Sequence, residues 1–352
     1  MARPLLALAL VALLLPGCLG GPSTPDREEG YEVVKVAEGF NALSQVAFAP
    51  DGRIFLAERL SGDVRVLRNG TLDPEPWAHV DVTNPGGYHE QGLLGLTLHP
   101  RFGMEPWVYL YYSYDADGRS WNRVVRLREA EGRGGTPEVL LDRIPGSKYH
   151  DGGVLAFGPD GMLWITTGEA HERGPAQDRD SVMGKILRLT PEGDPAPGGP
   201  FGSGNPAYTM GHRNVYGLAF DAQGRAWITE NGPNVNDEVN LLEAGANYGW
   251  PEVTGAPRDS RFRDAAWVWR APIAVTGIQV AGPAYGALEG DLIVGDYVTK
   301  NLRRLQVEDS PRIVAETSLA ELPEGITDVE TAPDGTIHVV TPTALYRLAV
   351  KV

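Results

Sequence analysis

The chain repeats one hairpin unit, which consists of an apolar strand, a turn of Pro-Asp-Gly type and a second apolar strand. The copies recur at irregular intervals, which leaves room in each unit for a further hairpin and variable loops. About six such units predict an all-β fold, a six-bladed β-propeller of four-stranded antiparallel blades. The copies span residues 46–58, 96–112, 155–169, 218–232, a weaker one at 285–297, and 329–341.

Two strand-like segments, 31–36 and 345–352, stand alone at the ends of this series. In a closed ring one segment completes the blade of the other and removes an exposed edge. We therefore expect residues 31–352 to form a single propeller domain. The 44 glycines and 28 prolines suit many short strands joined by turns.

The N-terminal stretch reads as an export signal. Residues 1–18 have a positive start at Arg3, an apolar run and small residues before Cys18, the only cysteine. The Leu-Pro-Gly-Cys sequence resembles a bacterial lipoprotein box, with simple cleavage nearby as the alternative. We expect a lipoprotein-type signal peptide over 1–18, a flexible tether over 19–30, and a periplasmic or cell-surface protein anchored by a lipid on Cys18.

The formal net charge is −15, and the acidic residues are dispersed. This charge is unsuited to nucleic acid or to an anionic membrane surface. The sequence therefore predicts no nucleic-acid partner, and membrane contact only through the anchor.

Aligning the hairpins on their first strands reveals a register of polar residues. Five positions before Leu96, Leu155 and Leu218 stand Gln91, His150 and Arg213. Eight positions after their turn glycines, two of the second strands reach Glu169 and Gly232. Antiparallel strands return to one edge, so these residues are expected at one end of the ring, here called the mouth. Any one of them alone could serve only loop backbone, but as a set they predict a site.

The set permits proton transfer. A carboxylate at Glu169 that accepts from one imidazole nitrogen of His150 leaves the other nitrogen free to act as a general base. Arg213 keeps its proton and stabilises negative charge that develops on an oxygen. The sequence contains no G-x-S-x-G or S-x-x-K nucleophile motif.

An oxygen-rich loop follows the fourth hairpin. It runs through Asn231, Gly232, Pro233 and Asn234 to Asp237, and it suits Ca²⁺, although a capped turn is the alternative. The remaining histidines lack metal-ligand spacing, so we interpret them as loop or packing residues: His89, His99, His171, His212 and His338.

Five ordered motifs carry a family resemblance: QGLLGLTLHPRF, HDGGVLAFGPDG, GHRNVYGLAF, ENGPNVNDEVN and NYGWP. They resemble the soluble pyrroloquinoline-quinone (PQQ)-dependent glucose and aldose sugar dehydrogenases. The resemblance extends from about Phe40 to Tyr346 and is strongest over residues 91–251.

This resemblance implies a six-bladed propeller that binds the quinone and Ca²⁺ at its mouth. His150 would take the proton of the anomeric hydroxyl while hydride passes to the quinone, and Glu169 replaces the family's usual Asp as its orienting acid. The sequence does not identify the molecule that receives the electrons from the reduced cofactor. The resemblance also implies quinone contacts by Gln91, Gln177, Arg213 and Asn214, and Ca²⁺ binding by Gly232 and Pro233.

The sequence also departs from the family pattern. Gly325 and Thr327 stand where the family carries two arginines that pair with the quinone carboxylates. In the fifth blade Val298 stands near the expected basic residue, with Lys300 close by as a predicted cofactor contact. Each lost charge-assisted bond is worth roughly 1.5 to 3 kcal/mol, so these departures are expected to reduce cofactor affinity. The cations that could compensate are Arg270, Lys300, Arg303 and Arg304.

Two alternatives remain open at this point. A Ca²⁺-dependent propeller lactonase would hold an axial metal with several side-chain carboxylates. A non-catalytic propeller that binds a carbohydrate or a protein partner would tolerate the missing arginines.

Overall fold

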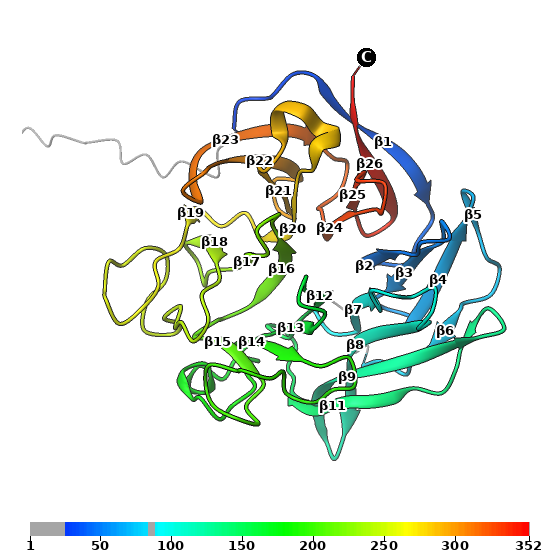
Figure 1. Ribbon diagram of the computed structural model, residues 1–352, viewed down its shortest axis with the longest axis horizontal. Coiled ribbons are helices and arrows are strands. Elements are labelled where there is room, and N and C mark those ends of the chain that lie inside the picture. The colour runs from blue at the N-terminus through cyan, green and yellow to red at the C-terminus, as the bar shows by residue number, and fades with distance from the viewer. Residues whose placement is uncertain (1–24, 84–88, 352) are drawn as a thin grey trace, which may run out of the picture.

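The computed structural model describes residues 25–83 and 89–351. Six antiparallel sheets stand as blades around a common centre (Figure 1), which confirms the predicted six-bladed β-propeller. The innermost strands β2, β7, β12, β16, β20 and β24 contact one another in ring order.

Each blade runs outward from its innermost strand, and blades 1 and 2 carry one additional strand each, β6 and β11. The first three blades are β2 (Leu43–Phe48), β3 (Ile54–Glu58), β4 (Asp63–Arg68), β5 (Thr71–Leu72) and β6 (Ala78–His79); β7 (Leu93–Leu98), β8 (Trp107–Ala116), β9 (Arg119–Ala130), β10 (Arg133–Gly134) and β11 (Glu138–Pro145); and β12 (Gly152–Phe157), β13 (Leu163–Thr167), β14 (Lys185–Leu189) and β15 (Ala207–Met210).

The last three blades follow the same plan. They are β16 (Val215–Phe220), β17 (Ala226–Glu230), β18 (Asp237–Leu241) and β19 (Trp267–Trp269); β20 (Val275–Val280), β21 (Leu292–Asp296), β22 (Asn301–Glu308) and β23 (Arg312–Glu321); and β24 (Asp328–Thr331), β25 (Ile337–Val340), β26 (Ala344–Val350) and β1 (Tyr31–Glu38). Two 3₁₀ helices, η1 (Gly174–Gln177) and η2 (Pro283–Leu288), lie in connections.

The ring closes as expected from the two isolated end segments. β1 pairs with β26 in antiparallel register, from Tyr31 opposite Val350 to Glu38 opposite Ala344. The N-terminal strand is therefore the outer strand of the C-terminal blade, and the two ends of the propeller hold each other.

The turn glycines explain why the hairpin unit recurs. Gly52, Gly161, Gly224 and Gly335 have φ between 74° and 86°, a left-handed conformation that costs glycine little. Neighbouring blades then pack through apolar side chains, as Phe55, Leu96 and Leu110 do between blades 1 and 2.

The fifth copy of the repeat lies elsewhere than the sequence predicts. Residues 285–288 of this predicted copy belong to η2, and the innermost strand is β20, where Ile278 pairs with Val294. Pro283 and Gly286 break the strand pattern, and Gly286 has φ 54°. The repeat is therefore present, but η2 separates its two strands.

Residues 1–18 and Cys18 lie outside the described part of the chain, as does most of the predicted tether. The described end of that tether contacts blade 5, where Arg27 bridges Ser318 and Glu28 pairs with Arg304 at 2.5 Å. Within residues 25–83 and 89–351, no helix has the length and apolarity needed to cross a membrane.

Two acidic residues on the innermost strand of blade 6 give the fold a pH-dependent stability. Burial raises the pKa of Glu330 to about 8, with the charge of Asp328 adding to it. The carboxylate Oε1 accepts hydrogen bonds from Gln279 Nε2 (3.2 Å) and Thr331 N (3.0 Å). Because the pKa in the folded state exceeds the ordinary 4.5, the folded state binds more protons between these values. Stability is thus lost as pH rises through about 8.

Glu330→Gln is expected to raise the melting temperature at pH 9 and leave it unchanged at pH 5. A glutamine oxygen can accept the same two hydrogen bonds without a buried charge. The side chain keeps some exposed surface, so we expect a gain of about 2 to 4 °C, equivalent to roughly 1 kcal/mol. Thermal melts at both pH values measure it, with exposed Glu321→Gln as the control. Equal melting of wild type and variant at pH 9 would contradict the linkage.

Candidate active site

The mouth is formed where chain segments lead into the innermost strands. Gln91, His150 and Arg213 lie two positions before β7, β12 and β16, and Glu169 and Gly232 lie two positions after β13 and β17. The backbone N–H of Glu169 donates to the carbonyl of Arg213 at 2.9 Å, which joins blades 3 and 4 at this edge. The structure therefore brings the His150, Glu169 and Arg213 segments together.

His150 and Glu169 form a buried pair. Nδ1 of His150 lies 2.5 Å from Oε1 of Glu169, and the residues are 8% and 1% exposed. Burial raises the pKa of Glu169, but the hydrogen bond from His150 and the charges of His150 and Arg213 outweigh it and leave the pKa lowered. The carboxylate therefore stays ionised and accepts from Nδ1–H, which leaves Nε2 as the basic nitrogen.

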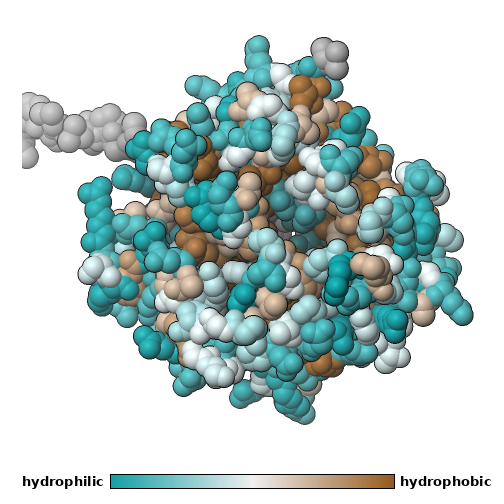
Figure 2. All heavy atoms as spheres, viewed as in Figure 1, coloured by the Kyte–Doolittle hydropathy of each residue, from teal (hydrophilic) through white to brown (hydrophobic). Residues whose placement is uncertain are grey.

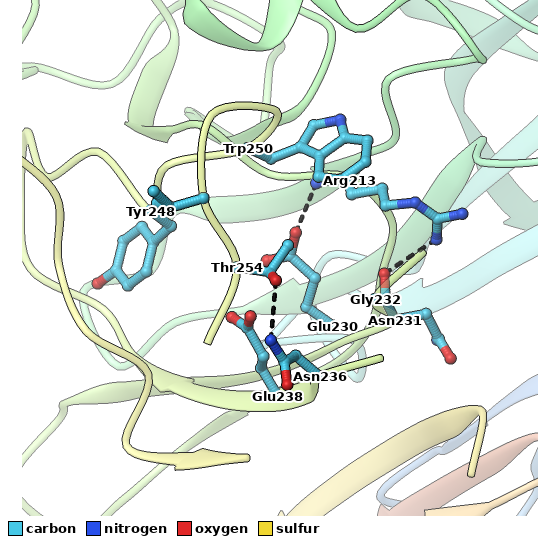
Figure 3. A pocket seen from close by; sticks show the side chains of 10 residues that line it. Arg213, Glu230, Asn231, Gly232, Asn236, Glu238, Tyr248, Trp250 and Thr254 are labelled. Atoms are coloured by element: carbon cyan, nitrogen blue, oxygen red, sulfur yellow. Dashed lines mark hydrogen bonds between the residues drawn. The ribbon is translucent and has the colours of Figure 1, made fainter. Parts of the chain in front are cut away.

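Arg213 is fixed at the mouth by the chain around it (Figure 3). Its Nη1 donates to the carbonyl of Asn231 at 3.0 Å, and its guanidinium lies 5.4 Å from the Trp250 ring centroid. Burial lowers the pKa of Arg213, and the nearby carboxylates of Glu169, Glu230, Glu90 and Asp237 oppose this shift. The cation is thus partly desolvated and surrounded by acids.

Glu230 holds the backbone of Arg213, and both residues line the small pocket drawn in Figure 3. Its Oε1 accepts a hydrogen bond from the Arg213 backbone N–H at 2.5 Å, and its Oε2 accepts one from Nδ1 of His212 at 2.8 Å. His212 is fully buried, in agreement with its interpretation as a packing residue.

Glu90 is a site residue that the sequence analysis missed. Its Oε2 accepts from the His150 backbone N–H at 2.6 Å and from Asn214 Nδ2 at 3.1 Å. Asn214 in turn accepts the Gly152 N–H through Oδ1 at 3.2 Å. His150 has φ 66°, an uncommon conformation for histidine, and these bonds hold it. The position directly before Gln91 was the only available signal.

The loop after β17 is shaped by Asp237 and leaves backbone oxygens available. Asp237 Oδ1 accepts from Gly232 N at 2.9 Å, and Oδ2 accepts from Ile273 N and Ala274 N at 2.8 and 2.7 Å. Burial raises the pKa of Asp237 despite these bonds. Within the described chain, no donor reaches the carbonyl oxygens of Gly232 and Pro233, so these are the oxygens of the loop best placed for a cation.

Side chains alone do not form a metal site in residues 25–83 and 89–351. No group of three His, Cys, Asp or Glu residues there is arranged to hold an ion. Because Asp237 already serves three amides, a cation at this loop would depend chiefly on carbonyl oxygens, which Ca²⁺ accepts readily.

The structure gives the predicted polar contacts different surroundings. Gln91 is buried and donates to Ser120 Oγ. Gln177 lies at the end of η1, where its amide bonds Asn247 and the Trp250 carbonyl, the latter at 2.6 Å. Gln177 thereby fixes the segment whose tryptophan lies against Arg213. Direct cofactor contact by either glutamine stays a prediction.

The edge of the mouth that lacks the two arginines is filled differently. A Cβ at Gly325 would lie 2.5 Å from Tyr297 Cδ2, so no larger residue fits there while Tyr297 keeps its place. Arg303 is 1% exposed and pairs with Asp296 at 2.7 Å, and Arg304 pairs with Asp291 at 2.6 Å. Lys300 is exposed and donates to the Pro323 carbonyl at 3.0 Å, which places a cation beside this edge. In the space-filling view both hydrophilic and hydrophobic residues border the central depression of the ring (Figure 2).

Comparison with known proteins identifies the family of the chain. A family model described as Glucose / Sorbosone dehydrogenase matches residues 40–348. Quinoprotein glucose dehydrogenase B of Acinetobacter calcoaceticus is 30% identical over 74% of this chain and 63% of its own length.

Two solved structures share the fold and part of the sequence. The PQQ-bound aldose sugar dehydrogenase of Streptomyces coelicolor has a TM-score of 0.82 at 31% identity and covers 93% of this chain and 100% of its own. A Thermus thermophilus protein assigned as a glucose dehydrogenase has a TM-score of 0.84 at 39% identity, with 91% and 100% coverage. The chain belongs to the glucose/sorbosone dehydrogenase family.

Proposed function

We propose that this protein oxidises the anomeric C1 hydroxyl of aldose sugars to the lactone, with PQQ and Ca²⁺ as cofactors. The observation that carries the proposal is the buried His150–Glu169 pair next to the Arg213 segment at the mouth. The PQQ-bound relative of the same fold supports the choice of cofactor.

His150 acts as the base in this scheme. Nδ1 is held by Glu169, so Nε2 accepts the proton of the sugar hydroxyl, and the carboxylate stabilises the resulting imidazolium. Because Glu169 is ionised and almost fully buried, its charge acts on the imidazole with little screening by solvent.

Arg213 supplies positive charge on the other side of the reaction. Its guanidinium is held by Asn231 and lies against Trp250, so it is oriented before substrate arrives. Such a preorganised cation stabilises negative charge that develops on an acceptor oxygen.

The residues present fit the cofactors, except at the edge of the mouth where Gly325 and Thr327 replace two arginines of the family. The carbonyls of Gly232 and Pro233 would hold Ca²⁺, while Arg213 and Lys300 would meet quinone carboxylates or carbonyls. The quinone, when bound, would supply the acceptor for the hydride of C1. Three further polar residues position the chain segments that line the mouth: Gln91, Gln177 and Asn214. Each would contact the cofactor directly only after exchanging its present hydrogen-bond partner.

Reconstitution tests this function. We expect purified protein loaded with PQQ and Ca²⁺ to reduce an artificial dye when supplied with glucose or another aldose, and protein without quinone to be inactive. Failure of the loaded protein across a broad aldose panel would end the dehydrogenase proposal.

The missing arginines favour one other candidate, a propeller that binds carbohydrate without catalysis. Quinone titration separates the two, because an enzyme requires micromolar or tighter quinone binding, whereas a binding module would retain sugar affinity without it. The lactonase alternative lacks its expected group of metal-binding carboxylates within the described chain.

We also propose that the protein is exported and anchored by a lipid on Cys18. The signal-like stretch 1–18 and the lipobox sequence that ends it support this proposal. Mass spectrometry of the mature protein is expected to find an acylated N-terminal cysteine, and an unmodified N-terminus would contradict it.

A further inference from the structure

His171 lies flat on the ring of His150. The two ring centroids are 4.2 Å apart and the planes differ by 7°. His171 is exposed while His150 is buried, so the outer ring covers one face of the proposed base. The sequence predicted that His171 is a loop or packing residue, but its contact with His150 places it at the mouth.

The backbone that carries His171 adopts an uncommon conformation. Ala170 and His171 have φ of 49° and 61°, in the left-handed region that few residues other than glycine occupy. Hydrogen bonds close this turn onto the active-site pair, from Ala170 N to the His150 carbonyl at 2.9 Å and from Glu172 N to the Glu169 carbonyl at 2.7 Å. Such conformations persist where the surroundings enforce them, often at functional sites.

The stack adds a constraint that Glu169 does not supply. The bond from Nδ1 to Glu169 fixes one edge of the His150 ring, but a ring held at one edge can still tilt. A parallel ring against its face opposes that tilt. His171 is itself backed by Tyr149, whose ring centroid lies 5.8 Å away.

The surroundings of His171 lower its pKa. Burial, then the charge of His150, lowers the pKa of His171, and Arg213 acts in the same direction. Glu169 and Glu90 oppose these effects without outweighing them. The lowered pKa means that His171 stays neutral over a wider pH range. A neutral ring can remain against His150 when that base takes up a proton, whereas a second cation would repel it.

We propose that His171 is a positioning residue, whose neutral ring holds the plane of His150 so that Nε2 faces the substrate hydroxyl. This inference rests on the proposed function. It assigns a role in turnover to a residue that need not contact the sugar or the cofactor.

Two substitutions separate the ring from its chemistry. His171→Phe keeps a flat ring, whereas His171→Asn removes it with a residue that tolerates left-handed backbone. In the holoenzyme we expect His171→Asn to lower kcat by about tenfold to 10²-fold with the sugar KM changed less than about twofold, because small misplacements of a base are costly. His171→Phe is expected to retain kcat within about twofold. Exposed His79→Asn on blade 1 is the control.

A second measurement needs no activity. NMR titration of ¹⁵N-histidine-labelled, cofactor-free protein is expected to give His171 a midpoint below that of an ordinary histidine. In His150→Phe, which keeps a stacked ring without charge, the midpoint is expected to rise. Unchanged kcat in folded His171→Asn, or a midpoint indifferent to His150→Phe, would overturn the inference. If the wild type oxidises no sugar, the proposed function fails, and the titration still decides whether the stacked pair is coupled.

Discussion

His150→Ala is expected to lower kcat for aldose oxidation by about 10² to 10⁴-fold, the usual contribution of a general base. The reason is local. Glu169 accepts a hydrogen bond from Nδ1 of His150 at 2.5 Å, so Nε2 is the nitrogen left to accept the proton. Without the imidazole, no other titratable side chain is held by Glu169 in this way within the described chain. Steady-state dye reduction by the quinone-loaded variant measures the effect.

Quinone titration of the same variant serves as its control. Retained quinone affinity together with lost turnover assigns the loss to proton transfer. Turnover within about threefold of wild type would show that His150 is not the base.

Gly232→Ala is expected to weaken Ca²⁺ binding, and with it quinone binding, by about 10²-fold, since a displacement of about 1 Å at a site has costs of that order. An added Cβ would lie 2.0 Å from the Val235 carbonyl oxygen and 2.5 Å from that of Asn236. These are backbone atoms, so the loop itself must shift. The shift would move the Gly232 and Pro233 carbonyls and strain the Gly232 bond to Asp237.

Calorimetric titration with Ca²⁺ and then PQQ measures this loss without relying on turnover. Gly103→Ala is the matched control, since a Cβ there meets nothing within 4 Å and neither glycine is left-handed. Unchanged affinity in Gly232→Ala would place the metal away from this loop.

The hairpin repeat was sufficient to predict the propeller because each blade begins with the same local signal. Position within that repeat also located His150, Glu169 and Arg213, since antiparallel strands return their ends to one edge. The prediction of the innermost strand of the fifth blade was wrong for a local reason. η2 separates β20 from β21, so the apolar run before Leu292 was matched to the wrong segment.

Contacts between blades could not be predicted from the sequence. Glu90 bonds His150 and Asn214 from 60 and 124 positions away, and no spacing within one hairpin reports such a partner. His171 looked like an ordinary loop histidine because its stack depends on two left-handed residues. The space at Gly325 depends on Tyr297 from the neighbouring blade, so the missing arginine could be read from sequence but its replacement could not.

Anaerobic single-turnover absorbance of the PQQ- and Ca²⁺-loaded protein tests the central claim most directly. Mixing with glucose is expected to convert the quinone spectrum to that of the quinol, and more slowly when C1 carries deuterium. A quinone spectrum that persists through saturating aldose would show that no sugar is oxidised at this mouth.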